Sequence, residues 1–267
     1  MAGFSWETFS DNIQKDLDSI NASFESSLDI LSMNPFDSAV VIDSAITSGV
    51  KAVSLTLVSL FFVMQFCNET MYLRLQSYEQ IFKLIFKFVL AKVLVDNARG
   101  LMGIIYNTFN GLVTDISSKA SGIMSTFDVA SIATKPSDKG WFGFNYLTTY
   151  ISAMPTILIL KGACWVISII FIGRLFEVII YSTIAPIPLA TFAGEGWSDS
   201  CKTFIKGYAA VCIQALVIML MFQAFNCISQ LTVNAGAGKL SITITALALA
   251  LGVVKSGQWS RQAVGLG

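Results

Sequence analysis

The first 36 residues alternate apolar and polar positions with the period of an α-helix. The apolar residues recur at steps of three and four, which places them in one narrow stripe along a helix. The stripe consists of Phe9, Ile13, Leu17, Ile20, Phe24, Leu28 and Leu31. Acidic residues occupy the opposite face, and Asn34-Pro35 ends the pattern. The spacing predicts an amphipathic helix that packs on its own domain or, because it is heptad-like, forms an oligomer face between copies.

Longer apolar stretches follow over residues 37–267, which we expect to form a polytopic membrane domain. A helical span needs about 20 apolar residues to cross a core of ~30 Å. The pattern predicts spans at about 47–67, 84–112, 147–172, 204–230 and 240–256. The last stretch is short and requires a thin bilayer or a cover of protein. A polar segment over residues 114–145 predicts an external loop between the second and third spans.

Residues 146–193 form an apolar run too long for one straight span. In one interpretation it holds two full spans with a turn at Gly173-Arg174, which gives six spans in all. In the other, one span leads into a re-entrant or interfacial hairpin over residues 174–200, broken at Pro186 and Pro188. Proline removes helix hydrogen-bond donors, and such backbone survives at membrane depth only under protein or water. We expect the prolines to set the hairpin shape rather than to act as a gate.

Charged residues interrupt two of the apolar stretches. Lys92, Asp96 and Arg99 are spaced by four and three, so they can form one ion-paired stripe along a helix. Charges inside a membrane are functional candidates by default, although snorkelling and pairing that only permit insertion are the simpler alternative. Arg174 and Glu177 lie one turn apart. They favour an interfacial salt bridge that orients the hairpin, with contact to a substrate phosphate as the second possibility.

The composition supports a membrane protein and argues against an enzyme. Of the 267 residues 54% are apolar and 13% charged, which is about half the charge of a typical soluble domain. The chain has no His, which removes the usual acid-base, nucleophile-activating and metal-ligating residue. Its five Cys are scattered without a C-x-x-C motif. We therefore expect no catalytic residues, no metal site and no cofactor.

The lysines and arginines favour one orientation in the membrane. With an extracytoplasmic N-terminus, five spans and a cytoplasmic C-terminus, eight of them lie on the cytoplasmic side and five outside. The eight are Arg74, Lys83, Lys87, Arg174, Lys202, Lys206, Lys255 and Arg261. Equal totals of 17 basic and 17 acidic residues leave no net field that would attract a polyanion.

Several segments resemble the VirB6/TrbL family of polytopic subunits of bacterial conjugative type IV secretion systems, most closely its branch in Gram-positive conjugative elements. They are residues 78–81 (Tyr-Glu-Gln-Ile), 90–97 (Leu-Ala-Lys-Val-Leu-Val-Asp-Asn), 173–177 (Gly-Arg-Leu-Phe-Glu), 185–190 (Ala-Pro-Ile-Pro-Leu-Ala) and 255–259 (Lys-Ser-Gly-Gln-Trp). With their spacing, the resemblance extends over roughly residues 35–260, and the acidic N-terminal helix falls outside it. None of these segments is a catalytic motif.

The resemblance implies a channel or channel-base subunit in the bacterial cytoplasmic membrane. Such a subunit forms a ring of copies and helps to pass single-stranded DNA with bound protein through the bilayer. Energy would come from partner ATPases among the other secretion subunits, because this chain has no Walker A motif. The alternative is a small-solute or ion transporter, in which broken helices also occur, although the sequence shows no inverted repeat.

Overall fold

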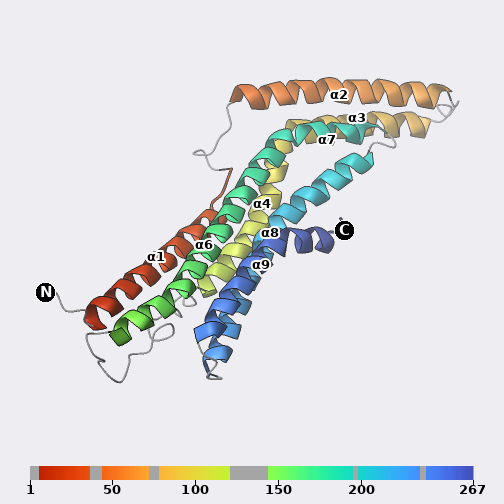
Figure 1. The fold of residues 1–267 in the computed structure, drawn as a ribbon. Coiled ribbons are helices and arrows are strands. Elements are labelled where there is room, and N and C mark those ends of the chain that lie inside the picture. Colours follow the sequence, from red (N-terminus) through yellow and green to blue (C-terminus); the bar gives the residue numbers. More distant parts are fainter. Residues whose placement is uncertain are drawn as a thin grey trace. The chain divides into compact units, whose positions relative to one another are not determined.

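The computed structural model describes residues 6–36, 44–71, 78–120, 144–194, 198–234 and 239–266 (Figure 1). Within these residues every regular element is helical. The helices are α1 (Trp6–Ser32), α2 (Ser44–Met71), α3 (Tyr78–Asp96), α4 (Ala98–Ala120), α6 (Phe144–Ile184), α7 (Pro186–Ala190), η5 (Thr191–Ala193), α8 (Ser198–Asn234) and α9 (Lys239–Ala263).

Three of the described helical stretches are long and apolar enough to cross a membrane: Ala45–Met71, Ala153–Ala193 and Ser198–Phe225. They correspond to the first, third and fourth spans that the sequence predicts. The predicted span 84–112 is divided between α3 and α4, and the predicted span 240–256 lies in α9. Most of the expected loop over residues 114–145 lies outside the described residues, and its first part continues α4 to Ala120.

Helix α6 passes through Gly173-Arg174 without a turn. A glycine in a helix costs only about 1 kcal/mol relative to alanine, which the apolar packing on both sides offsets. The interpretation with a turn at this dipeptide is therefore wrong. The interruption comes at Ala185, whose backbone is still helical (φ −46°, ψ −38°), and Pro186 takes the first position of α7. The Ala185 N–H donates to Tyr181 at 2.9 Å, so the prolines interrupt the helix for a single residue.

Helices α3 and α4 are separated by Asn97 alone. The Asn97 side-chain amide donates to the Val93 carbonyl at 3.0 Å, and the Asn97 backbone N–H uses the same acceptor at 3.1 Å. Such competition between side chain and backbone bends helices. The bend explains why the sequence pattern, which is apolar on both sides of Asn97, predicts one helix where the chain forms two.

The described chain divides into two compact units. Unit 1 comprises Met1–Met33, Leu112–Gly173 and Ala215–Gly257. In it α1 and the first part of α6 run in the same direction, because Asp16 and Ser27 contact Lys161 and Ser168 in that order. Its core also holds residues of α4, α8 and α9, with the Phe171 and Phe222 rings edge to face at 6.1 Å.

Unit 2 comprises Asn34–Gly111, Arg174–Gln214 and Gln258–Gly267. Helices α2 and α3 form an antiparallel pair in which the Phe62 and Phe88 rings lie 4.5 Å apart, and α7 packs against both. The end of α6 runs antiparallel to the start of α8, with Tyr181 beside Phe204 at 5.4 Å.

Candidate functional site

The apolar stripe of α1 is used within the chain. Ile13, Leu17, Ile20 and Leu31 are buried in the core of unit 1, at 3% exposure or less. The expectation that the stripe is an oligomer face therefore does not hold for these four residues, because the chain's own helices already cover them. The side chains of Phe9, Phe24 and Leu28 lie outside the described residues.

A lysine of α6 pairs with an aspartate of α1. Lys161 Nζ donates to Asp16 Oδ1 at 2.6 Å, and the two side chains are 40% and 33% exposed. Lys161 is the one charged residue of the predicted span 147–172. Two turns further along α6, the Ser168 hydroxyl lies 2.5 Å from that of Ser27. These two polar contacts fix the register of α1 along a helix that is otherwise apolar on this side.

Arg174 is buried in unit 2. Its side chain is 4% exposed, its Nε donates to the Val211 carbonyl at 3.2 Å, and its guanidinium lies 5.8 Å from the centre of the Tyr106 ring. The fully buried Tyr208 donates its hydroxyl to the Met102 carbonyl at 3.0 Å. A buried cation is tolerated only with such partners. The cluster joins α4, α6 and α8 in unit 2 and gives Arg174 a structural role.

The remaining residues predicted for the hairpin differ in how far they are buried and do not form one cluster with Arg174. Glu177 is exposed and forms no ion pair with another described residue, so it is not the partner of Arg174. Pro186 and Leu189 are buried in α7, while Pro188 is half-buried and lines a pocket described below. The structure thus brings Arg174 to the α8 backbone, and not to Glu177.

The predicted stripe of Lys92, Asp96 and Arg99 crosses the bend at Asn97. All three side chains are exposed. Asp96 pairs with Lys51 of α2, Oδ1 to Nζ at 3.1 Å, and Lys51 also donates to the Asp96 carbonyl at 3.4 Å. Among the described residues neither Lys92 nor Arg99 forms an ion pair. The ion pair of this stripe therefore joins α2 to the end of α3.

The partners Asp16, Lys51, Tyr106 and Tyr208 are the contributions that the sequence reasoning missed. One signal was available for the first of them: Lys161 stands alone in an apolar run, and the preceding amphipathic helix carries an excess of carboxylates. A lone intramembrane charge calls for a partner from another element.

The described residues contain no group of three His, Cys, Asp or Glu placed to hold a metal ion, and the five cysteines are free thiols. The contacts described above hold helices together. No family model, curated protein or solved structure matches the chain.

Proposed function

We propose that this chain is a multi-pass membrane subunit that assembles with copies of itself around an axis. More specifically, we propose a channel or channel-base subunit of a bacterial conjugative type IV secretion system, which helps single-stranded DNA with bound protein to cross the cytoplasmic membrane. The segments that resemble the VirB6/TrbL family support the specific part. Partner ATPases and other secretion subunits would complete the machine.

The surface of α6 supports the membrane location. Its outward residues Leu158, Trp165 and Ile169 in unit 1 are 68–73% exposed, and α2 and α3 in unit 2 expose further apolar residues of their own. A soluble protein rarely exposes so many large apolar side chains, whereas lipid requires them. The proposed topology has five spans, at the ranges that the sequence predicts, with the N-terminus outside and the C-terminus in the cytoplasm.

The observation that carries the assembly is the placement of α1. Because its apolar stripe is buried against the chain's own core, its acidic face points outward beside the apolar α6 helix. Asp11, Asp18 and Glu25 are exposed on that face. Because Asp16 pairs with Lys161 of the third predicted span, α1 adjoins a span, and carboxylates there are expensive in contact with lipid and therefore face water or protein. A ring of copies supplies such a polar interior, and a lone subunit does not.

The mass of the purified particle tests the assembly. We expect an oligomer both in mild detergent and in lipid nanodiscs, with copies around an axis in low-resolution images. A strictly monomeric particle in both media contradicts the proposal. Crosslinking in cells from positions 92 and 99 to a transferring DNA strand tests the specific function. The absence of any crosslink along residues 84–112 removes that segment from the DNA path.

Thiol labelling tests the position of α1. In a chain whose five cysteines are replaced by serine or alanine, we expect Glu25→Cys to react with a membrane-impermeant reagent. Ile169→Cys, on the outward face of α6, is the matched control that lipid should protect. Equal protection at both positions contradicts a water-facing α1 surface.

A small-solute or ion transporter is the second candidate. The interruption at Ala185 in an apolar helix favours it, because transporters place substrate sites at broken helices. Substrate-dependent uptake by the protein alone in proteoliposomes would support this candidate over the first.

A further inference from the structure

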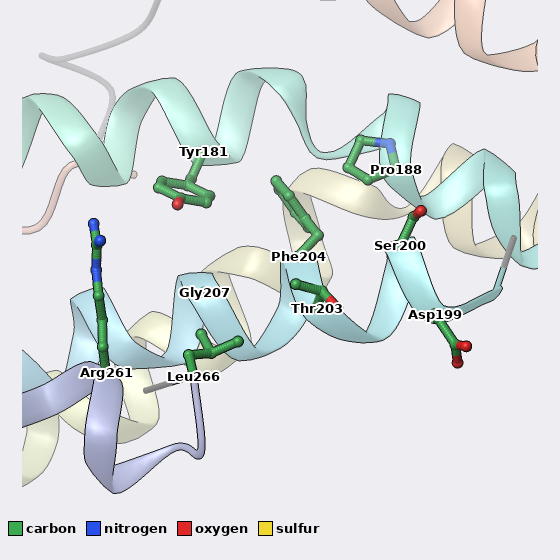
Figure 2. A pocket seen from close by; sticks show the side chains of 9 residues that line it. All are labelled: Tyr181, Pro188, Asp199, Ser200, Thr203, Phe204, Gly207, Arg261 and Leu266. Carbon is green, nitrogen blue, oxygen red and sulfur yellow. The ribbon is translucent and has the colours of Figure 1, made fainter.

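A pocket of about 740 Å³ opens beside the N-terminal turns of α8 (Figure 2). Its walls come from α6, α7, α8, the last turn of α9 and the residues after it, all within unit 2. The lining residues are Tyr181, Pro188, Asp199, Ser200, Thr203, Phe204, Gly207, Arg261 and Leu266. Gly207 leaves the space beside Tyr181 open, because a Cβ at this position would contact the Tyr181 hydroxyl at 3.5 Å.

One cation in this pocket is uncompensated. Arg261 is exposed, its side chain has no ion-pair or hydrogen-bond partner among the described residues, and Figure 2 shows it extending toward Tyr181. The one acidic lining residue, Asp199, already accepts a hydrogen bond from Lys202 Nζ at 3.0 Å. In Figure 2 Ser200 and Thr203 lie on the far side of Phe204 from Arg261, so the pocket offers a guanidinium beside the Tyr181 hydroxyl at one end and the Ser200 and Thr203 hydroxyls at the other.

The rest of the pocket wall is apolar. It lies near the ends of two helical segments that are long and apolar enough to cross a membrane. The Tyr181 and Phe204 rings are 5.4 Å apart, and Leu266 and Pro188 extend this surface. The pocket adjoins the end of the candidate span Ala153–Ala193 and the start of Ser198–Phe225. In a membrane protein such helix ends lie at the level of the lipid headgroups.

We propose that this pocket binds a phosphate group, carried by the headgroup of a glycerophospholipid or by a soluble phosphate ester. A guanidinium binds phosphate oxygens with two parallel hydrogen bonds, and the Tyr181 hydroxyl on the same side of the pocket can donate to a remaining oxygen. The aromatic and aliphatic wall covers the glycerol carbons. Basic pockets at helix ends are known headgroup sites. This inference uses the membrane location proposed above but not the assembly or the transport of DNA.

Native mass spectrometry of the delipidated full chain in neutral detergent tests the pocket. The probes are phosphatidylglycerol, diacylglycerol of the same chain length, and glycerol 3-phosphate. We expect phosphatidylglycerol to be retained and diacylglycerol to be lost. Arg261→Gln should weaken phosphatidylglycerol binding about tenfold or more, as expected for loss of a charged hydrogen-bond donor. Arg261→Lys should restore part of the affinity.

Lys206→Gln is the matched control, because Lys206 is an exposed cation of α8 that does not line the pocket. Both substitutions are at exposed positions, so melting temperatures should stay close to the parent value. Binding of glycerol 3-phosphate with the same loss in Arg261→Gln, and no preference for the lipid, identifies a soluble ester as the ligand. Equal retention of phosphatidylglycerol and diacylglycerol, or equal losses in the two variants, overturns the proposal. A monomeric mass in the same spectra bears on the assembly alone and leaves the pocket proposal unchanged.

Discussion

Helix α6 carries two cations that the two units accommodate differently. In unit 1 Lys161 reaches a carboxylate of α1, and about 40% of its side chain stays exposed. In unit 2 Arg174 is buried and is held by a backbone carbonyl and the face of Tyr106. A guanidinium is weakly hydrated and planar, so neutral acceptors can satisfy it, whereas the compact ammonium group of lysine needs a stronger partner or water. Arg174 therefore holds α4, α6 and α8 together inside unit 2, whereas Lys161 attaches α1 to α6 in unit 1.

Arg174→Ala should have the largest effect. It removes the Nε donor and leaves a cavity in the core of unit 2, so we expect a loss of about 3 kcal/mol in the free energy of unfolding. Thermal unfolding in detergent, followed by tryptophan fluorescence, measures it. The exposed Glu177→Ala on the same helix should stay within about 0.5 kcal/mol. Similar shifts in the two variants contradict the structural role of Arg174.

Reciprocal swaps sharpen the comparison. Arg174→Lys should cost about 1–2 kcal/mol, because an ammonium group cannot reproduce the planar contact with Tyr106 and the carbonyl together. Lys161→Arg should be nearly neutral, since a longer cation still reaches Asp16 at a partly open site. Thermal unfolding in detergent measures both variants. Equal losses of stability for Arg174→Lys and Lys161→Arg would show that the two sites do not differ in the cation that they require.

Tyr208→Phe should cost about 1 kcal/mol, the net worth of one buried hydrogen bond, because its hydroxyl donates to the Met102 carbonyl. Tyr78→Phe is the control, at a side chain that is 92% exposed. A neutral result for Tyr208→Phe would show that the hydroxyl adds nothing to the Arg174 cluster.

The pair between Asp16 and Lys161 should contribute less than the Arg174 cluster. A double-mutant cycle with Asp16→Asn and Lys161→Gln should give a coupling energy below about 1 kcal/mol, because water screens a pair that is more than a third exposed. A coupling above about 2 kcal/mol would mean that lipid or protein excludes water there. It would contradict the water-facing surface of α1.

The smallest effect should come from Glu79 on α3, outside the spans. Its hydrogen bond and charge contact with Lys83, at 2.6 Å, lower the pKa of the Glu79 carboxyl. The folded state then binds the proton less readily than the unfolded state, so the contact stabilises above the ordinary glutamate pKa and is lost as the pH falls through the lowered value. Glu79→Gln should therefore reduce the melting temperature slightly at pH 7 and not at pH 2. An identical difference at both pH values contradicts this assignment.

Periodicity and apolar length predict much of this fold. The stripe of α1, three of the apolar helices and the interruption near Pro186 follow from spacing, because each depends on residues close together in the sequence. The division at Asn97 could have been suspected only from one asparagine in an apolar run. The unbroken passage through Gly173-Arg174 depends on packing that the glycine itself does not reveal.

The sequence alone could not predict which residues contact the charged side chains. Lys51 with Asp96 and Asp16 with Lys161 join elements far apart in the chain, and spacing within one helix favours neighbours such as Lys92 or Glu177 instead. Arg174 shows the same limit more strongly, since its partners are a carbonyl and an aromatic face, which no charge pattern marks.

The end of α6 has a mechanical consequence. Ser182 and Thr183 both donate their hydroxyls to the Ile179 carbonyl, and a few residues later Pro186 and Pro188 have no N–H to offer. Such hydroxyl bonds loosen a helix, and missing donors weaken it further. The last turn of α6, directly before the prolines, should therefore deform more easily than a helical turn that keeps all its backbone donors.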